Sequence, residues 1–319
     1  MITILGAGGA IGGQLAKQLA AKGQPFRLVD RAPRTTPGAT ELVVADLTDL
    51  DQTVRAVAGS SVVYLVVGLK YDHAVWKELW PRVMSNTIEA CKRAGAKLVF
   101  FDNVYPYGKV SGPMTEETPF NPCSAKGEVR AQVATALIAA WTSGALTALI
   151  ARSADFYGPD AVNGVPDQLV FEPLSKGKKP SWLVNDSVPH SLTFTPDAAR
   201  GLLELSDTST SWNQTWHLPT APNPPTGAEL IAMAAREFGA ASGHRLLGKG
   251  MIRIAGWFNP LIRESYEMLY QSESPYLFDS GKHARELGFA GTPYAQGVRA
   301  TATAFQRGAL SMGAQPARA

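Results

Sequence analysis

The feature that most constrains the fold is an alternation in the first half of the chain, where apolar runs of four to seven residues are each followed by a helical pattern. This rhythm is typical of βαβ units, which form a parallel sheet covered by helices. The run at 62–67 is apolar throughout, as expected of a strand buried on both faces. The predicted strands are 2–5, 26–29, 41–44, 62–67, 97–101, 146–152 and 215–218.

Helical patterns lie between these runs and continue after residue 220. In the pattern at 74–94, Trp76, Trp80, Val83 and Met84 recur at helical spacing, which is more typical of a core or dimer contact than of a ligand site. A chain of 319 residues exceeds what one core usually supports, so we expect two lobes. The predicted helices are 11–22, 50–57, 74–94, 124–141, 226–238, 251–270 and 282–287.

Composition excludes several classes of protein. The 30 basic and 27 acidic residues give a formal net charge of +3 without a basic stripe, so we expect no nucleic-acid partner. Two cysteines, Cys91 and Cys123, are too few for a disulfide scaffold and fit a reducing cytoplasm. No signal segment and no run of about 18 apolar residues occurs, so we expect neither export nor a membrane partner. Five scattered histidines indicate no metal site.

A glycine-rich run, Gly6-Ala7-Gly8-Gly9-Ala10-Ile11-Gly12, joins the first predicted strand directly to a helix. In such a turn, backbone N–H groups and the helix N-terminus can bind a pyrophosphate. The spacing is GxxGxxG, because Ile11 stands where GxGxxG needs its third glycine. The predicted contacts to a dinucleotide in this run are Gly6, Gly9, Ala10, Ile11 and Gly12.

Asp30 ends the second predicted strand, close to the distance of about 20 residues at which a carboxylate binds the adenosine ribose. Its charge favours NAD, since it would repel a 2′-phosphate. Arg31 and Arg34 follow at once and could clamp that phosphate, so NADP stays open as an alternative, as does a solvated loop. Asp46 and Leu47 stand where an adenine contact would be made, although Asp46 could equally cap the next helix.

Further motifs follow the fifth and sixth strands. They are FFDNVYPYG at 100–108 and RSADFYGP at 152–159, with FDS at 278–280, LGF at 287–289 and TP at 292–293 near the end. With the glycine run, Asp30 and Asp46-Leu47, they resemble the extended short-chain dehydrogenases, the NAD-dependent epimerase/dehydratase group, over residues 1 to 305. The resemblance implies an α/β fold with a doubly wound, seven-stranded Rossmann sheet, a smaller C-terminal substrate lobe and a homodimer built from two helices per subunit.

The resemblance also divides the chain. Residues 1–155, completed by parts of 190–220, are expected to form the NAD(P)-binding Rossmann domain. Residues 156–189 and 221–310 are expected to form the substrate lobe, and 311–319 a flexible tail. Val67, which ends the fourth apolar run, is included among the predicted cofactor contacts.

The family's proton donor is a tyrosine four residues before a lysine. Lys126 fits the lysine, because it opens a predicted helix, and it is expected to hold the nicotinamide ribose. Four residues earlier stands Pro122, which cannot donate a proton, so the pair is broken. The family's serine or threonine falls on Asn103, whose amide can still orient a carbonyl group.

The next two positions hold Val104 and Tyr105, where related 4,6-dehydratases have an Asp-Glu pair, and this argues against dehydration. We predict that Tyr105 replaces the missing tyrosine as proton donor. The alternative is that Tyr105 and Tyr107 are only aromatic walls of the site.

The predicted substrate contacts are Tyr107, Asp155 and Tyr157, although Asp155 could instead only cap a turn. The expected function is that of an NAD(P)-dependent oxidoreductase or epimerase acting on a hydroxyl or keto group of a small organic or sugar-like substrate. The alternative is a non-catalytic NAD(P)-binding sensor or scaffold protein, which the loss of the tyrosine at Pro122 would favour.

Overall fold

The chain forms two compact units in the computed structural model, which describes residues 1–308. The first unit contains Met1–Pro106, Ala125–Ser153 and Ala198–Leu218, and the second contains Tyr107–Ser124, Ala154–Asp197 and the chain from Pro219 onward. The predicted tail at 311–319 lies outside the described residues. No helix among residues 1–308 is long and apolar enough to cross a membrane.

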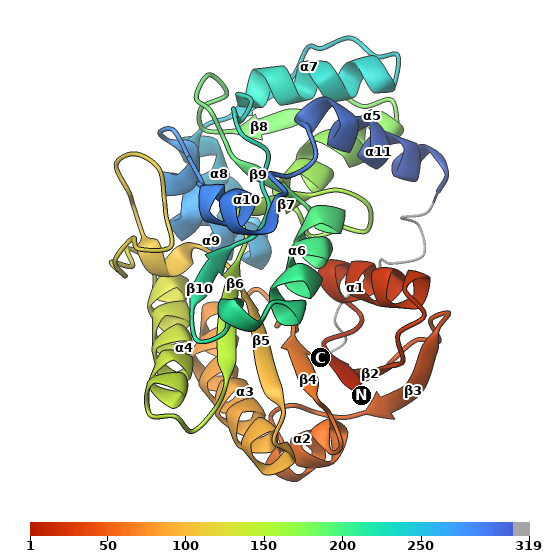
Figure 1. Ribbon diagram of the computed structural model, residues 1–319. Helices are drawn as coiled ribbons and strands as arrows, with labels where there is room; N and C mark the ends of the chain where they lie inside the picture. Colours follow the sequence, from red (N-terminus) through yellow and green to blue (C-terminus); the bar gives the residue numbers. More distant parts are fainter. Residues whose placement is uncertain (309–319) are drawn as a thin grey trace. The chain divides into compact units, whose positions relative to one another are not determined.

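The first unit is built on a parallel seven-stranded sheet in the order β10-β6-β5-β4-β1-β2-β3 (Figure 1), which confirms the predicted doubly wound Rossmann fold. The strand order reverses between β1 and β4, the place where such sheets bind ligands at their carboxyl ends. Its strands are β1 Ile2–Leu5, β2 Phe26–Asp30, β3 Ala39–Val44, β4 Val62–Leu65, β5 Lys97–Asp102, β6 Ala148–Arg152 and β10 Thr215–His217.

Helices cover both faces of this sheet. In Figure 1, α2, α3 and α4 lie on one face and α1 and α6 on the other. The predicted core stripe of α3 is confirmed, because Trp76, Trp80, Val83 and Met84 are all buried. The helices are α1 Ala10–Ala21, α2 Leu50–Val57, α3 His73–Ala94, α4 Ala125–Thr142 and α6 Thr195–Asp207.

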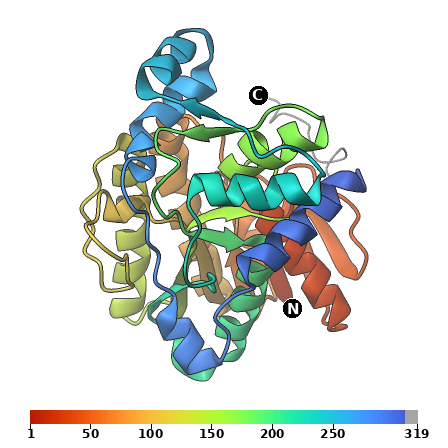
Figure 2. The ribbon, with the colours of Figure 1, turned by 90° about the horizontal axis from the view of Figure 1, so that it is seen from above.

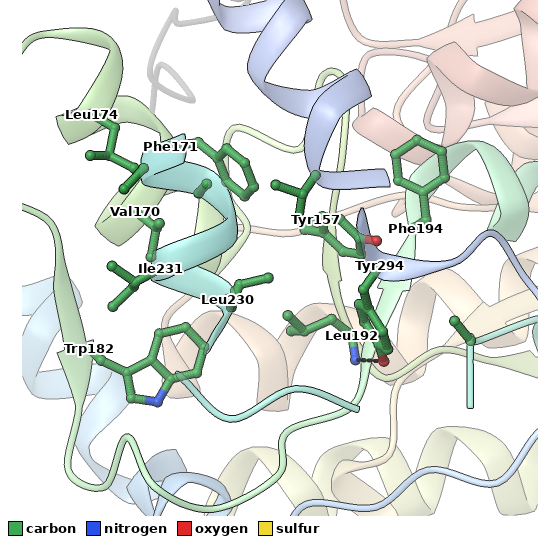
Figure 3. Close-up of a cluster of buried hydrophobic side chains, with 14 residues drawn as sticks. Tyr157, Val170, Phe171, Leu174, Trp182, Leu192, Phe194, Leu230, Ile231 and Tyr294 are labelled. Atoms are coloured by element: carbon green, nitrogen blue, oxygen red, sulfur yellow. Dashed lines mark hydrogen bonds between the residues drawn. The ribbon is translucent and has the colours of Figure 1, made fainter. Parts of the chain in front are cut away.

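The second unit has short strands and several small helices around its own hydrophobic core. Strand β7 (Asp155–Tyr157) pairs with β9 (Leu192–Phe194), and β8 (Ser181–Leu183) with β11 (Arg245–Leu247), both in parallel. Figure 3 shows Tyr157, Phe194 and Tyr294 in the core, where Leu192 N donates a hydrogen bond to the Tyr294 hydroxyl at 3.1 Å. The first unit also contains η3 Ser209–Ser211, and η1 Tyr105–Tyr107 spans the boundary in sequence between the two units. The remaining elements of the second unit are η2 Asp167–Phe171, α5 Glu172–Ser175, α7 Gly227–Glu237, α8 Lys249–Phe258, α9 Pro260–Ser265, η4 Tyr266–Ser272, α10 Gly281–Leu287 and α11 Tyr294–Gln306.

The predicted single helix at 251–270 is wrong. Helix α8 ends at Phe258, α9 begins at Pro260, and the chain continues as the 3₁₀ helix η4. The break is at Asn259, whose backbone is extended, with φ −132° and ψ 112°. Pro260 favours a new helix here, because proline has no N–H for an i→i−4 bond and its fixed φ suits the first helical position. Asn259 caps the new helix by accepting from Leu261 N at 2.9 Å.

Candidate active site

The glycine run lies at the carboxyl end of β1, beside the switch point of the sheet. Gly6 has φ +94°, and a Cβ there would stand 2.3 Å from Val67 Cα. A Cβ on Gly12 would stand 2.7 Å from the carbonyl oxygen of Gly6. Both positions therefore require glycine. Gly9 is the N-cap of α1 and forms no side-chain cap, so the helix N-terminus keeps N–H groups for an anion such as a pyrophosphate.

Asp30 ends β2 beside this run. Its Oδ2 accepts from Gly8 N at 3.2 Å and its Oδ1 from Ala32 N at 3.2 Å, which orients the carboxylate. Arg31 and Arg34 are both exposed in the loop that follows. This site combines two positions that only glycine fits, an uncapped helix N-terminus and an oriented carboxylate, and together they suit a dinucleotide.

Asp46 does not cap α2, so that alternative is wrong. Asp49 is the N-cap and accepts from Gln52 N at 2.9 Å. The Asp46 side chain instead accepts from the backbone and the hydroxyl of Thr48, at 2.9 and 2.8 Å, and Leu47 beside it is buried. The adenine contact predicted for Asp46 and Leu47 stays a prediction.

The structure brings Lys126 and Tyr105 together through a residue that sequence reasoning missed. Lys126, in the first turn of α4, is fully buried, and its Nζ lies 4.8 Å from the ring centre of Tyr71. The Tyr71 hydroxyl lies 3.5 Å from that of Tyr105, whose ring stacks on Trp76. Tyr71 follows the fourth strand, and this place at the carboxyl edge of the sheet was the available signal.

Asn103 has a structural contact of its own. Its Oδ1 accepts a hydrogen bond from Tyr105 N at 3.0 Å. This bond forms a turn at the start of η1 and so fixes the position of Tyr105. Under this turn lies a buried ionic cluster of Asp102, Arg130 and Arg152, all in the first unit. The Arg130 guanidinium also stacks over Trp80, 4.2 Å from its ring centre.

Asp155, at the start of β7 in the second unit, pairs with His190, whose Nε2 lies 2.9 Å from Asp155 Oδ2. The alternative that Asp155 only caps a turn does not describe it. His190 is buried and stacks on Tyr276, with ring centres 4.4 Å apart, while its edge meets Trp182. The aromatic rings fix the imidazole, and the imidazole fixes a carboxylate that stays partly exposed.

The other predicted substrate residues of the second unit are buried. Tyr107 packs near Phe120, with ring centres 6.3 Å apart. Tyr157 lies in the core between Phe194 and Tyr294 (Figure 3), and burial raises the pKa of its hydroxyl well above the ordinary value. These positions favour packing over contact with a substrate.

Comparisons with known proteins agree with this geometry. Residues 2–208 match the model of the NAD dependent epimerase/dehydratase family. No curated protein matches the sequence.

Solved structures with the same fold cover nearly the whole chain. The dTDP-glucose 4,6-dehydratase DesIV of Streptomyces venezuelae, a double mutant with NAD bound, has a TM-score of 0.81 at 19% identity, covering 98% of this chain and 100% of its own. The UDP-glucose 4-epimerase of Thermus thermophilus, with NAD, has a TM-score of 0.76 at 18% identity, covering 97% and 100%. That of Thermotoga maritima, with UDP-glucose, has 0.78 at 15% identity, covering 97% and 99%. At these identities the likeness shows the fold.

Proposed function

Because the chain belongs to the NAD dependent epimerase/dehydratase family, we propose that it is an NAD-dependent oxidoreductase or epimerase acting on a hydroxyl or keto group of a small organic or sugar-like molecule. One observation carries the proposal. The carboxyl edge of a single sheet bears both a loop in which Gly6 and Gly12 admit only glycine and a buried lysine grouped with two tyrosines. The loop suits a dinucleotide, and the tyrosines suit proton transfer.

The bound cofactor would supply a hydride acceptor or donor. Asp30 would accept from the adenosine ribose hydroxyls, and the N-terminus of α1 would bind the pyrophosphate. Lys126 would hold the nicotinamide ribose, and its buried charge would stabilise negative charge on a nearby phenolic oxygen. Tyr105 would exchange the proton with the substrate oxygen, and Tyr71 would hold the Tyr105 hydroxyl in place.

The substrate would meet Asp155. A carboxylate already fixed by His190 can accept a hydrogen bond from a hydroxyl group, and it would repel an anionic group at the same point. A sugar-like polyol supplies such hydroxyls, and the similar structures named above include a UDP-glucose 4-epimerase with UDP-glucose bound. Dehydration is disfavoured, because Val104 and Tyr105 stand where an acid–base pair would be needed.

A homodimer and a cytoplasmic location belong to the same proposal. Helices α3 and α4 enclose a surface groove of about 330 Å³. Its lining combines the apolar residues Pro81, Met84, Ile88, Val133 and Ala136 with the polar residues Ser85, Glu89, Lys92 and Gln132. A groove with apolar residues and charges of both signs suits the same groove of a second copy packed in isologous fashion. Cys91 and Cys123 are both free thiols, as a reducing compartment requires.

The first test is calorimetric binding of NAD, NADH, NADP and NADPH to the wild-type protein and to Asp30→Ala. We expect a preference for NAD that the variant loses. Preference for NADP would indicate that Arg31 and Arg34 bind the 2′-phosphate of the cofactor. Loss of that preference in Arg31→Ala would then decide the point. Absence of binding by every form would end the proposal.

A second test separates the enzyme from a non-catalytic NAD sensor, the alternative that Pro122 favours. Wild-type protein with NAD would be screened against alcohols, ketones and sugars by absorbance of the reduced nicotinamide. Turnover that Tyr105→Phe lowers strongly, with NAD affinity retained, supports the proposed proton donor. Turnover untouched by that variant would remove Tyr105 from the mechanism. NAD bound tightly with no turnover on any substrate would favour the sensor.

A further inference from the structure

Helices α8 and α9 present large apolar side chains to solvent. Met251, Ile254 and Phe258 recur along one face of α8 and are 59%, 56% and 85% exposed, and Trp257 beside them is 71% exposed. Seven of the eleven exposed large apolar side chains among residues 1–308 fall between Leu246 and Tyr266. An apolar patch of this size on a protein surface marks a contact site.

The two helices form a hairpin that keeps this face outward. A Cβ on Gly256 would stand 3.1 Å from Arg263 Cα, so glycine allows α8 and α9 to pack closely. Ile252 is the buried apolar side chain of α8, so the remaining apolar residues turn away from the unit. In Figure 2 the two helices lie side by side, away from α7 and α11 of the same unit.

The charge of the hairpin, residues 249–265, is positive. It carries three basic residues, Lys249, Arg253 and Arg263, against one acidic residue, Glu264, a net charge of +2. Lys249 pairs with Glu273, whereas Arg253 and Arg263 are exposed, as is Arg245 on β11 just before α8 in the chain.

We propose that the hairpin docks on the surface of a bilayer that carries anionic lipids. A helix with exposed Trp and Phe on its apolar face and basic residues around it is the kind that lies in the interface, its aromatic rings among the acyl chains and its cations near the phosphates. A second copy fits less well, because an isologous contact would bring two surfaces of net charge +2 together. The proposal revises the expectation of no membrane partner, which depended on the absence of a spanning run, whereas surface binding needs only one apolar face.

The test is co-sedimentation of the full chain with vesicles of phosphatidylcholine alone and of equal parts phosphatidylcholine and phosphatidylglycerol. We expect binding to the anionic vesicles that weakens in high salt and is much weaker with phosphatidylcholine alone. The double variant Trp257→Ser with Phe258→Ser should lower the affinity by about tenfold or more. The double variant Arg253→Glu with Arg263→Glu should remove the preference for anionic lipid. Val44→Ser, a matched control at a residue also 71% exposed but on β3, should bind as the wild type does.

Thermal unfolding of each variant checks that the fold is intact. Because the substituted side chains are exposed, we expect little change in Tm. Failure of the wild type to bind anionic vesicles overturns the proposal, as does binding that both hairpin variants retain. Light scattering tests whether a second copy of the chain covers the patch instead. If the wild type self-associates and the double variant Trp257→Ser with Phe258→Ser does not, a second copy covers the patch and the bilayer proposal is wrong.

Discussion

Arg130 donates from its Nε to Oδ1 of Asp102 at 2.8 Å, and this bond ties α4 to the carboxyl end of β5. Lys126 lies one turn before Arg130 on α4, and Asn103 follows Asp102 directly. The second arginine, Arg152, reaches Oδ2 of the same carboxylate at 3.3 Å from β6. One buried carboxylate therefore fixes the relative places of two predicted catalytic residues.

Asp102→Asn should lower the free energy of unfolding by about 3–5 kcal/mol, because two buried guanidinium groups would lose their counter-charge. Urea unfolding followed by circular dichroism measures this. Glu78→Gln is the control, since Glu78 pairs with Arg82 on the exposed face of α3 and its loss should change the unfolding midpoint little. Similar effects of the two substitutions would contradict the role given to Asp102.

Gly6→Ala should abolish NAD binding and destabilise the protein, because the added Cβ meets Val67 at 2.3 Å and the residue has φ +94°. Gly13→Ala is the matched control at the residue directly after the run, since a Cβ there has no atom within 4 Å and the residue lies inside α1. The control should keep NAD binding and gain about 0.5–1 kcal/mol of stability. Calorimetry and thermal unfolding of both variants decide, and normal NAD affinity in Gly6→Ala would refute the predicted close approach.

Asp167 opens the π-helix η2 and is buried. Burial raises the pKa of its carboxyl well above the ordinary value of 3.8, with the Gly158 backbone N–H acting in the opposite direction. As pH rises past the ordinary value, the unfolded chain loses this proton while the folded protein keeps it. The free energy of unfolding therefore falls, by at most about 1.4 kcal/mol per pH unit, until the folded carboxyl also ionises.

Asp167→Asn should remove this contribution, so the variant should gain stability relative to the wild type as pH rises from about 4 through neutrality. Urea unfolding over that pH range measures the difference. Asp51→Asn, at an exposed carboxyl in the first turn of α2, should leave the pH dependence as in the wild type. A constant difference between wild type and Asp167→Asn across the range would show that the carboxyl ionises normally in the fold.

Ala136→Arg should shift the proposed dimer towards monomer, because the new side chain places charge in the groove between α3 and α4. Ala139→Arg adds the same charge to an exposed position of α4 that does not line the groove, and should leave the dimer intact. Light scattering over a range of protein concentrations measures both. A wild-type protein that stays monomeric at every concentration would remove the dimer from the proposal.

The sheet was predictable because its signals are local. The boundaries of β1 and α2 were predicted to the residue, since β1 runs into the glycine turn and α2 begins after a capping aspartate. The strands β7, β8, β9 and β11 were missed, because three residues are too few to show a period. Helix α6 was also missed, although buried apolar residues from Ala198 to Leu205 recur along it.

The candidate site, like the fold, was only partly predictable from the sequence. The glycine run and Asp30 have recognisable spacings, and Lys126 opens a predicted helix, so these residues could be predicted from the sequence. Tyr71 joins the group through contacts with Lys126, 55 positions further along the chain, and with Tyr105. Its place after the fourth strand is the one local signal, and no local pattern encodes the contacts themselves. The pairing of Asp155 with His190 is equally distant in sequence and depends on β7 lying beside β9.

The Asp30 carboxylate accepts one backbone N–H on each oxygen, from Gly8 and from Ala32. Each oxygen retains a second lone pair for a ribose hydroxyl. The two hydrogen bonds therefore hold the side chain in one orientation, and binding of a nucleotide costs little side-chain conformational entropy at Asp30. Affinity at this end of the cofactor is set by the fixed direction of the lone pairs, so a flexible Glu at position 30 would keep the charge and still bind more weakly.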